Sequence, residues 1–106
     1  MDNRFRAWLE DIEQSINEIF DFIPPNRNFH TYQTDIKTKK AVERNLEIIG
    51  EAVNRIIKYK ESSLKIENSQ KIVDTRNRII HEYDAISDEI IWTIVLQELP
   101  LLKIEI

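Results

Sequence analysis

Residues 72–83 gather the side chains of this chain that are best suited to chemistry on a phosphate ester. The segment reads Ile72-Val73-Asp74-Thr75-Arg76-Asn77-Arg78-Ile79-Ile80-His81-Glu82-Tyr83. A guanidinium can bind two phosphate oxygens at once and oppose the negative charge that develops in a transition state. An imidazole titrates near neutral pH and can accept or donate a proton. Arg76 and His81 are therefore the candidate catalytic residues.

The reaction that these groups could catalyse is cleavage of RNA without a metal ion. RNA supplies its own nucleophile, the 2′-hydroxyl, and His81 could take its proton or protonate the leaving 5′-oxygen. Asn77 could orient the imidazole or the phosphate, and Tyr83 could bind the phosphate or present an exposed hydroxyl. Judged by spacing alone, the segment also fits a solvated helix face, because the helix macrodipole favours a histidine near a C-terminus.

Helical geometry separates the two candidate catalytic residues. A helix would place Asn77, Arg78 and His81 on one face, together with Asp74. At about 100° per residue, Arg76 would lie roughly 140° away from His81. Two arrangements would still bring both to one phosphate: a helix that ends before His81, or a two-fold dimer that places two copies of the segment across one groove.

The composition describes a helical protein with a single domain, residues 1–106. The chain has one glycine, three prolines and 32% charged residues, and its length suits one hydrophobic core. It has no cysteine and only two histidines, so we predict no metal site, and we expect no cofactor. No apolar run approaches the roughly 18 residues of a membrane span, and the N-terminus lacks the apolar region of a signal peptide. We therefore expect a cytoplasmic protein.

Charge is distributed unevenly along the chain. The formal net charge of −4 argues against a protein that coats nucleic acid by charge alone. Residues 35–60 nevertheless hold seven basic side chains against four acidic ones. Residues 1–23 hold two against six, and residues 84–106 hold one against five. The middle of the chain could therefore make local contact with a polyanion.

Hydrophobic periodicity predicts an all-α fold, an up-and-down four-helix bundle with a kinked C-terminal helix. The apolar faces of its helices comprise Phe5, Trp8, Leu9, Ile12, Ile16, Ile19 and Phe20; Val42, Leu46, Ile49, Ala52, Val53, Ile56 and Ile57; Ile72, Val73, Ile79 and Ile80; and Ile91, Trp92, Val95, Leu96 and Leu99. Prolines 24 and 25 end the first helix, and the segment Asn26–Gln33 is predicted to be a connector. Thr34-Asp35 opens the second helix, Asn68 or Ser69 the third and Ser87 the fourth, which Pro100 kinks or ends.

Gly50 is the only glycine of the chain and lies within the second predicted helix. A glycine in a helix interior costs about 1 kcal/mol relative to alanine. A small residue at this position indicates the close approach of another helix or of a bound group, and packing is the simpler explanation.

Three segments resemble the HepT-like toxins of the HEPN superfamily. Arg76-Asn77-Arg78-Ile79-Ile80-His81-Glu82-Tyr83 matches the family motif R-x4-H-x-Y, including a polar residue directly after the arginine. Arg44-Asn45-Leu46-Glu47-Ile48-Ile49-Gly50-Glu51-Ala52 resembles the helix signature L-E-x-I-G-E-A, and Trp92 with Leu99-Pro100-Leu101-Leu102 resembles the family's C-terminal helix. The segments lie in the family's order, and the resemblance runs from roughly Trp8 to Lys103.

The resemblance implies a metal-independent ribonuclease toxin of a prokaryotic type II/VII-like toxin–antitoxin pair. It implies a HEPN-type helical domain that forms a homodimer, with the two motifs facing a shared cleft and RNA as the substrate. Arg76 and His81 become the catalytic pair and Asn77 a supporting polar group. The partner would be a minimal nucleotidyltransferase antitoxin that transfers AMP to Tyr83, adding bulk and negative charge beside the site. The acidic stretch that begins at Asp84 would repel RNA from this region.

Two other functions fit some of these features. A non-catalytic helical module that presents nucleotide or substrate to a nucleotidyltransferase would have no need of an arginine–histidine pair. If the protein is a helical dimer without any site, His81→Ala should be silent in cells.

Overall fold

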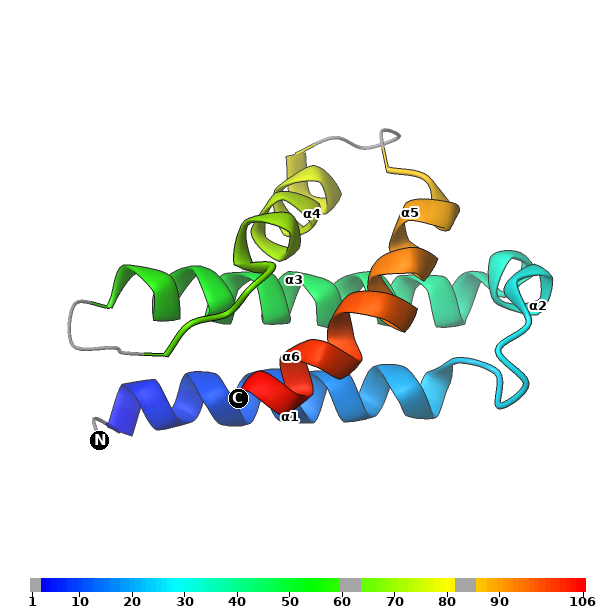
Figure 1. Ribbon diagram of the computed structural model, residues 1–106. Coiled ribbons are helices and arrows are strands. Elements are labelled where there is room, and N and C mark those ends of the chain that lie inside the picture. Colours follow the sequence, from blue (N-terminus) through cyan, green and yellow to red (C-terminus); the bar gives the residue numbers. More distant parts are fainter. Residues whose placement is uncertain (1–2, 60–63, 82–85) are drawn as a thin grey trace.

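Helices account for most of the residues that the structure, a computed structural model, describes: residues 3–59, 64–81 and 86–106 (Figure 1). In chain order these are α1 (Asn3–Phe22), α2 (Phe29–Thr34), α3 (Ile36–Lys58), α4 (Ser69–His81), α5 (Asp88–Thr93), the π-helical segment η1 (Ile94–Glu98) and α6 (Leu99–Glu105). The last three follow one another without a break, so that four long helical segments and the short α2 make up the described fold. The predicted all-α class and helical bundle are confirmed. None of the described helices has the length and apolar character needed to cross a membrane.

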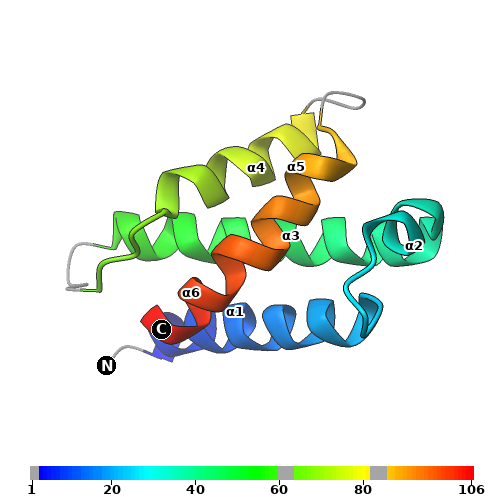
Figure 2. The ribbon, with the colours of Figure 1, turned by 45° about the vertical axis from the view of Figure 1, so that its right-hand side comes forward.

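Helices α1 and α3 lie side by side along most of their length and form the base of the bundle (Figures 1 and 2). Helix α4 packs on α3, and the segment α5–η1–α6 runs obliquely across both long helices. The core between them is almost entirely aliphatic: Phe5, Ile12, Ile16, Ile19, Ile23, Tyr32, Val42, Leu46, Ile49, Ala52, Val53, Ile56, Ile66, Ile72, Val73, Ile91, Trp92, Ile94, Val95, Leu99 and Leu102. Burial of these apolar side chains is the main source of stability for helices of this length.

The beginnings of two helices follow from their capping residues. The Asp35 carboxylate accepts hydrogen bonds from the Thr38 backbone N–H at 3.2 Å and from the Thr38 hydroxyl at 2.7 Å. These bonds lower the pKa of Asp35 from its ordinary value. At α5 the Ser87 hydroxyl accepts from the Ile90 N–H at 3.2 Å. Both caps agree with the predicted helix starts.

The predicted connector 26–33 is wrong in part, because α2 begins at Phe29 inside it and continues to Thr34. Asn28 caps this short helix by accepting a hydrogen bond from the Thr31 N–H at 2.9 Å. Tyr32 is fully buried and stacks on Trp92, with ring centroids 4.8 Å apart. A local cap and one aromatic anchor thus order six residues that show no helical periodicity long enough to recognise.

The C-terminal helix is distorted one turn before the predicted position. The Leu99 N–H bonds to the Ile94 carbonyl, five residues back, which creates the wide turn of η1. Pro100 has no N–H to donate, and the helix absorbs it in the first turn of α6 and continues to Glu105. Pro100 therefore does not end the helix.

Two residues of the predicted apolar faces are exposed. Ile57 is 43% exposed and Ile80 is 37% exposed. Helix α4 crosses α3 at an angle, and its C-terminal end, which carries Ile80, lies away from α3 in both views (Figures 1 and 2). Residues near the ends of crossing helices lose contact that periodicity alone assigns to them.

Glu43 on α3 allows a test of the electrostatics of this bundle. Burial raises the pKa of its carboxyl, and Asp88 and Glu47 raise it further against the opposing effect of Lys39 and Lys40. A carboxyl whose pKa is raised on folding stabilises the fold below its unfolded pKa, and this contribution is lost as the pH rises through the folded pKa.

The substitution Glu43→Gln is therefore expected to increase the free energy of unfolding at pH 7. Above about pH 4.5, the free energy of unfolding of this variant should also depend less on pH than that of the native protein. The gain should stay below about 1 kcal/mol, because solvent screens this partly exposed group. Urea unfolding at pH 4 and pH 7 measures it, with Glu13→Gln on the exposed face of α1 as the control. A loss of stability at pH 7 would contradict the assignment.

Candidate active site

Helix α4 carries three of the four predicted site residues. Arg76 and Asn77 are half-buried in its middle, and His81 is exposed as its last residue. The fourth, Tyr83, lies outside the described residues. The structure therefore describes the arginine, the amide and the imidazole of the predicted site.

The N-terminal part of α4 is held by the C-terminal helical segment. Glu98 of η1 is 7% exposed. Its carboxylate accepts a hydrogen bond from the Asn68 side chain and pairs with the Lys71 ammonium at 3.2 Å. Near the start of the same helix, Ile72 and Val73 enter the core. These contacts fix the helix on which the site is built.

The stem of Arg76 lies directly against α3 at Gly50. A Cβ atom built on Gly50 would clash with the Arg76 Cβ and come within 2.7 Å of its Cγ. The Ile72 carbonyl oxygen would be 3.4 Å away. The close helix approach predicted from the lone glycine is therefore confirmed, and its partner is the candidate catalytic arginine.

The guanidinium of Arg76 is held by its neighbour in the chain. Its Nη1 donates a hydrogen bond to Asn77 Oδ1 at 2.9 Å. Its Nε is buried and has no partner among the described residues. Asn77 thus contacts the arginine. Its predicted role in orienting the imidazole or the phosphate stays a prediction. The remaining Nη hydrogens are the donors that could reach a phosphate.

Arg76 and His81 do not point to the same place within one chain. Helix α4 continues through His81, so the five-residue spacing keeps the two side chains roughly 140° apart. Arg76 faces α3, whereas His81 is exposed at the helix end. The proposed alternative in which the helix ends before His81 is therefore wrong. The arrangement that uses a second copy stays a prediction.

The exposed side of α3 combines basic residues with ion pairs. Arg44 pairs with Glu47 at 2.9 Å and Arg55 with Glu51 at 2.7 Å, each within one helical turn. Lys37, Lys40 and Lys58 are exposed on the same helix. The net excess of positive charge on α3 lies on the helix that packs against α4, where it could attract a polyanion.

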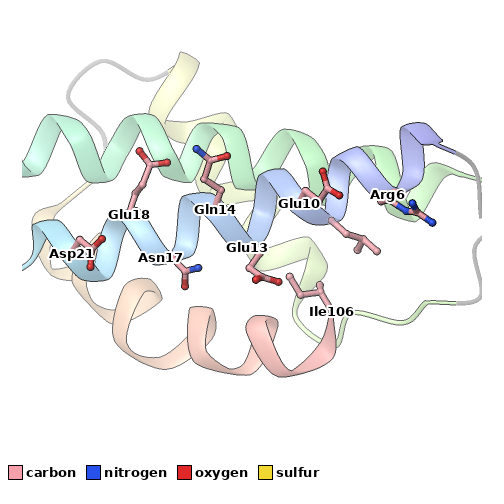
Figure 3. A pocket seen from close by; sticks show the side chains of 9 residues that line it. Arg6, Glu10, Glu13, Gln14, Asn17, Glu18, Asp21 and Ile106 are labelled. Atoms are coloured by element: carbon pink, nitrogen blue, oxygen red, sulfur yellow. The ribbon is translucent and has the colours of Figure 1, made fainter.

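A separate hollow of about 540 Å³ lies along α1 (Figure 3). It is lined by Arg6, Leu9, Glu10, Glu13, Gln14, Asn17, Glu18, Asp21 and Ile106. Four carboxylates against one guanidinium make it unsuited to phosphate. No residue of α4 lines it, so it does not belong to the candidate active site.

The fold and the site define an all-helical protein whose arginine and histidine, five residues apart, project from a helix packed on a glycine. Residues 12–106 match the model of the HepT-like ribonuclease family, and the chain belongs to this family. The predicted family and enzyme class, a ribonuclease, are thereby confirmed.

Relatives with curated names agree with this assignment. A Methanocaldococcus jannaschii protein, provisionally named as an RNase, is 39% identical over 100 residues, which cover 90% of this chain and 78% of the relative. A Caldanaerobacter subterraneus protein with a similar name is 33% identical, covering 92% and 87%. A Thermococcus cleftensis protein, provisionally named as the ribonuclease HepT, is 33% identical, covering 97% and 93%. No solved structure matches the chain significantly.

Proposed function

We propose that this protein is a metal-independent endoribonuclease and the toxin of a prokaryotic toxin–antitoxin pair, with Arg76 and His81 as its catalytic residues. The observation that carries the proposal is the arginine of a ribonuclease family held in place by Gly50 and Asn77, five residues before an exposed histidine. Residues 1–106 act as one HEPN-type domain. It works in the cytoplasm, where its RNA substrate is found.

In the proposed reaction the RNA 2′-oxygen attacks the adjacent phosphorus. A bond forms between O2′ and phosphorus, and the bond between phosphorus and O5′ breaks. The proton of the 2′-hydroxyl passes to a base, and the 5′-oxygen receives a proton, so the products are a 2′,3′-cyclic phosphate and a 5′-hydroxyl. His81 performs one of these transfers. Arg76 stabilises the charge on the non-bridging phosphate oxygens.

A homodimer would resolve the divergence of the two side chains. Within one chain α4 carries Arg76 and His81 on different sides. A two-fold axis that sets Arg76 of one protomer opposite His81 of its partner would, by symmetry, form this pair twice. Each catalytic centre would then take its arginine and its histidine from different chains.

The antitoxin in this proposal is a minimal nucleotidyltransferase that transfers AMP to Tyr83. A tyrosyl adenylate carries a negative charge and a bulky base two residues from His81. The charge would repel an RNA phosphate, and the base would occupy the space beside the imidazole. Modification and cleavage would therefore exclude each other.

Incubation of the purified dimer with total RNA in EDTA tests the proposed activity. Mass spectrometry first confirms that Tyr83 carries no AMP. We expect cleavage by the native protein that leaves 2′,3′-cyclic phosphate ends, and none by folded Arg76→Ala or His81→Ala. Absence of cleavage by the unmodified native protein would favour a non-catalytic module that presents nucleotide or substrate to the nucleotidyltransferase.

The variant Tyr83→Phe is expected to cleave RNA and to resist silencing by the nucleotidyltransferase with ATP. Phenylalanine keeps the ring but has no hydroxyl to accept AMP. The measurement is residual cleavage after incubation with enzyme and ATP, with Tyr59→Phe as the matched control that stays sensitive. If both variants are silenced equally, the modified residue is not Tyr83; if the inhibitor acts without ATP, silencing works by occlusion.

A further inference from the structure

We infer that Gly50 is a positioning residue for Arg76: the missing side chain on α3 lets the α4 backbone come close enough to fix the direction of the guanidinium. This inference rests on the proposed function, because it assigns a purpose to the arginine. Gly50 is 26 positions before Arg76 in the sequence and is not part of the R-x4-H-x-Y motif. The two residues are in contact because α3 packs against α4.

The backbone at Gly50 does not itself require glycine. The residue sits inside the 23-residue helix α3, and no glycine of the described chain has a positive φ. A conformational need for glycine is therefore absent here. What remains is the space that a Cβ would occupy, and that space is filled by the Arg76 stem.

Arg76 could not relieve a clash with a side chain at position 50 by changing its rotamer. The nearest atom to a Cβ at position 50 would be the Arg76 Cβ, whose place is set by the α4 backbone. Rotation of the side chain can move its Cγ but not its Cβ. The Ile72 carbonyl, one turn earlier on α4, limits the same approach. Any side chain at position 50 must therefore push α4 away from α3.

Packing of the stem and one hydrogen bond of the guanidinium together set the position of Arg76. A free surface arginine would turn its Nε–H toward solvent, since an unpaired buried donor is costly. In Arg76 this donor is buried without a described partner, while Nη1 is bound to Asn77. The stem is clamped at one end by α3 and the guanidinium at the other by Asn77. Such a side chain is preorganised for a phosphate.

The substitution Gly50→Ala tests this inference through two readouts. We expect kcat for RNA cleavage to fall by roughly 10- to 100-fold with little change in KM, because a misplacement of about 1 Å affects the transition state most. We also expect the Arg76 Nε–H signal in a side-chain NMR spectrum to exchange slowly with water in the native protein and rapidly in the variant. Asn54→Ala, one turn along α3, is the matched control for added helix propensity.

The two readouts separate failure of this inference from failure of the proposed function. Full activity and a protected Nε–H in Gly50→Ala would overturn the positioning role, whatever the reaction is. Full activity in Arg76→Ala would instead overturn the proposed function, while the NMR signal still tests the clamp. Should Gly50→Ala fail to fold, the double variant Gly50→Ala/Arg76→Gly moves the glycine to the other helix and is expected to restore cooperative unfolding. An unfolded double variant would contradict the inference.

Discussion

The substitution His81→Ala is expected to lower the rate of RNA cleavage by roughly 10²- to 10⁴-fold, the range typical of a positioned general acid or base. The fold should be unaffected, because the His81 side chain is exposed at the last residue of α4 and closes no part of the core. His30 on α2, the second histidine of the chain, is also exposed and provides the matched control. His30→Ala should cleave RNA at the native rate.

Arg76→Ala is expected to cost roughly 10²- to 10³-fold, as loss of a donor to the developing phosphate charge does. Arg76→Met keeps the stem that packs on Gly50 and removes the buried Nε, which has no partner among the described residues. It should therefore be as inactive as the alanine variant but at least as stable as the native protein. Single-turnover cleavage and urea unfolding measure both effects. An active methionine variant would remove the arginine from the mechanism.

A mixture of the inactive variants Arg76→Ala and His81→Ala is expected to recover activity. After subunit exchange between Arg76→Ala and His81→Ala, half of the dimers are mixed. Each mixed dimer would combine Arg76 of one protomer with His81 of the other in one of its two centres. The expected rate is roughly a quarter of the native rate, a rise of tenfold or more over either variant alone.

The mixing experiment depends on the helical geometry of α4. If one chain supplied both groups to a centre, no mixed dimer would contain an intact pair and the mixture would stay inactive. Exchange is verified by native mass spectrometry of the mixture. A mixture that exchanges subunits but does not cleave RNA would contradict a catalytic centre shared between two chains. It would then be unexplained how Arg76 and His81 of one chain, about 140° apart on α4, reach one phosphate.

Much of the fold could be predicted because its helices are amphipathic and well capped. Asp35 and Ser87 mark helix starts that the structure confirms through hydrogen bonds to Thr38 and to the Ile90 N–H. The short α2 escaped prediction because six residues cannot display helical periodicity. The π-turn at Ile94–Glu98 escaped it because the apolar residues of this segment also fit an α-helical stripe, so no local signal marks the wider turn.

The candidate site was predictable by residue type but not by contact. The pattern Arg76, Asn77, His81 suggested phosphate chemistry, and the lone glycine suggested close packing. The sequence does not show that Gly50 and Arg76 are in contact, because packing of the whole core decides where α3 and α4 cross. The anchor at Glu98 was also missed. The only local signal of this anchor is a charged residue, Glu98, on the buried, apolar face of its helical segment.

The role of the RNA 2′-hydroxyl is tested by cleavage of an RNA oligonucleotide with a mapped cleavage site, in EDTA. The same oligonucleotide with a single 2′-deoxy nucleotide just 5′ of that bond is the comparison. We predict cleavage of the all-RNA oligonucleotide, with a 2′,3′-cyclic phosphate end, and no cleavage of the 2′-deoxy oligonucleotide at that bond. Equal cleavage of both, or 5′-phosphate ends that form only with added Mg²⁺, would contradict a reaction driven by the RNA 2′-hydroxyl with Arg76 and His81.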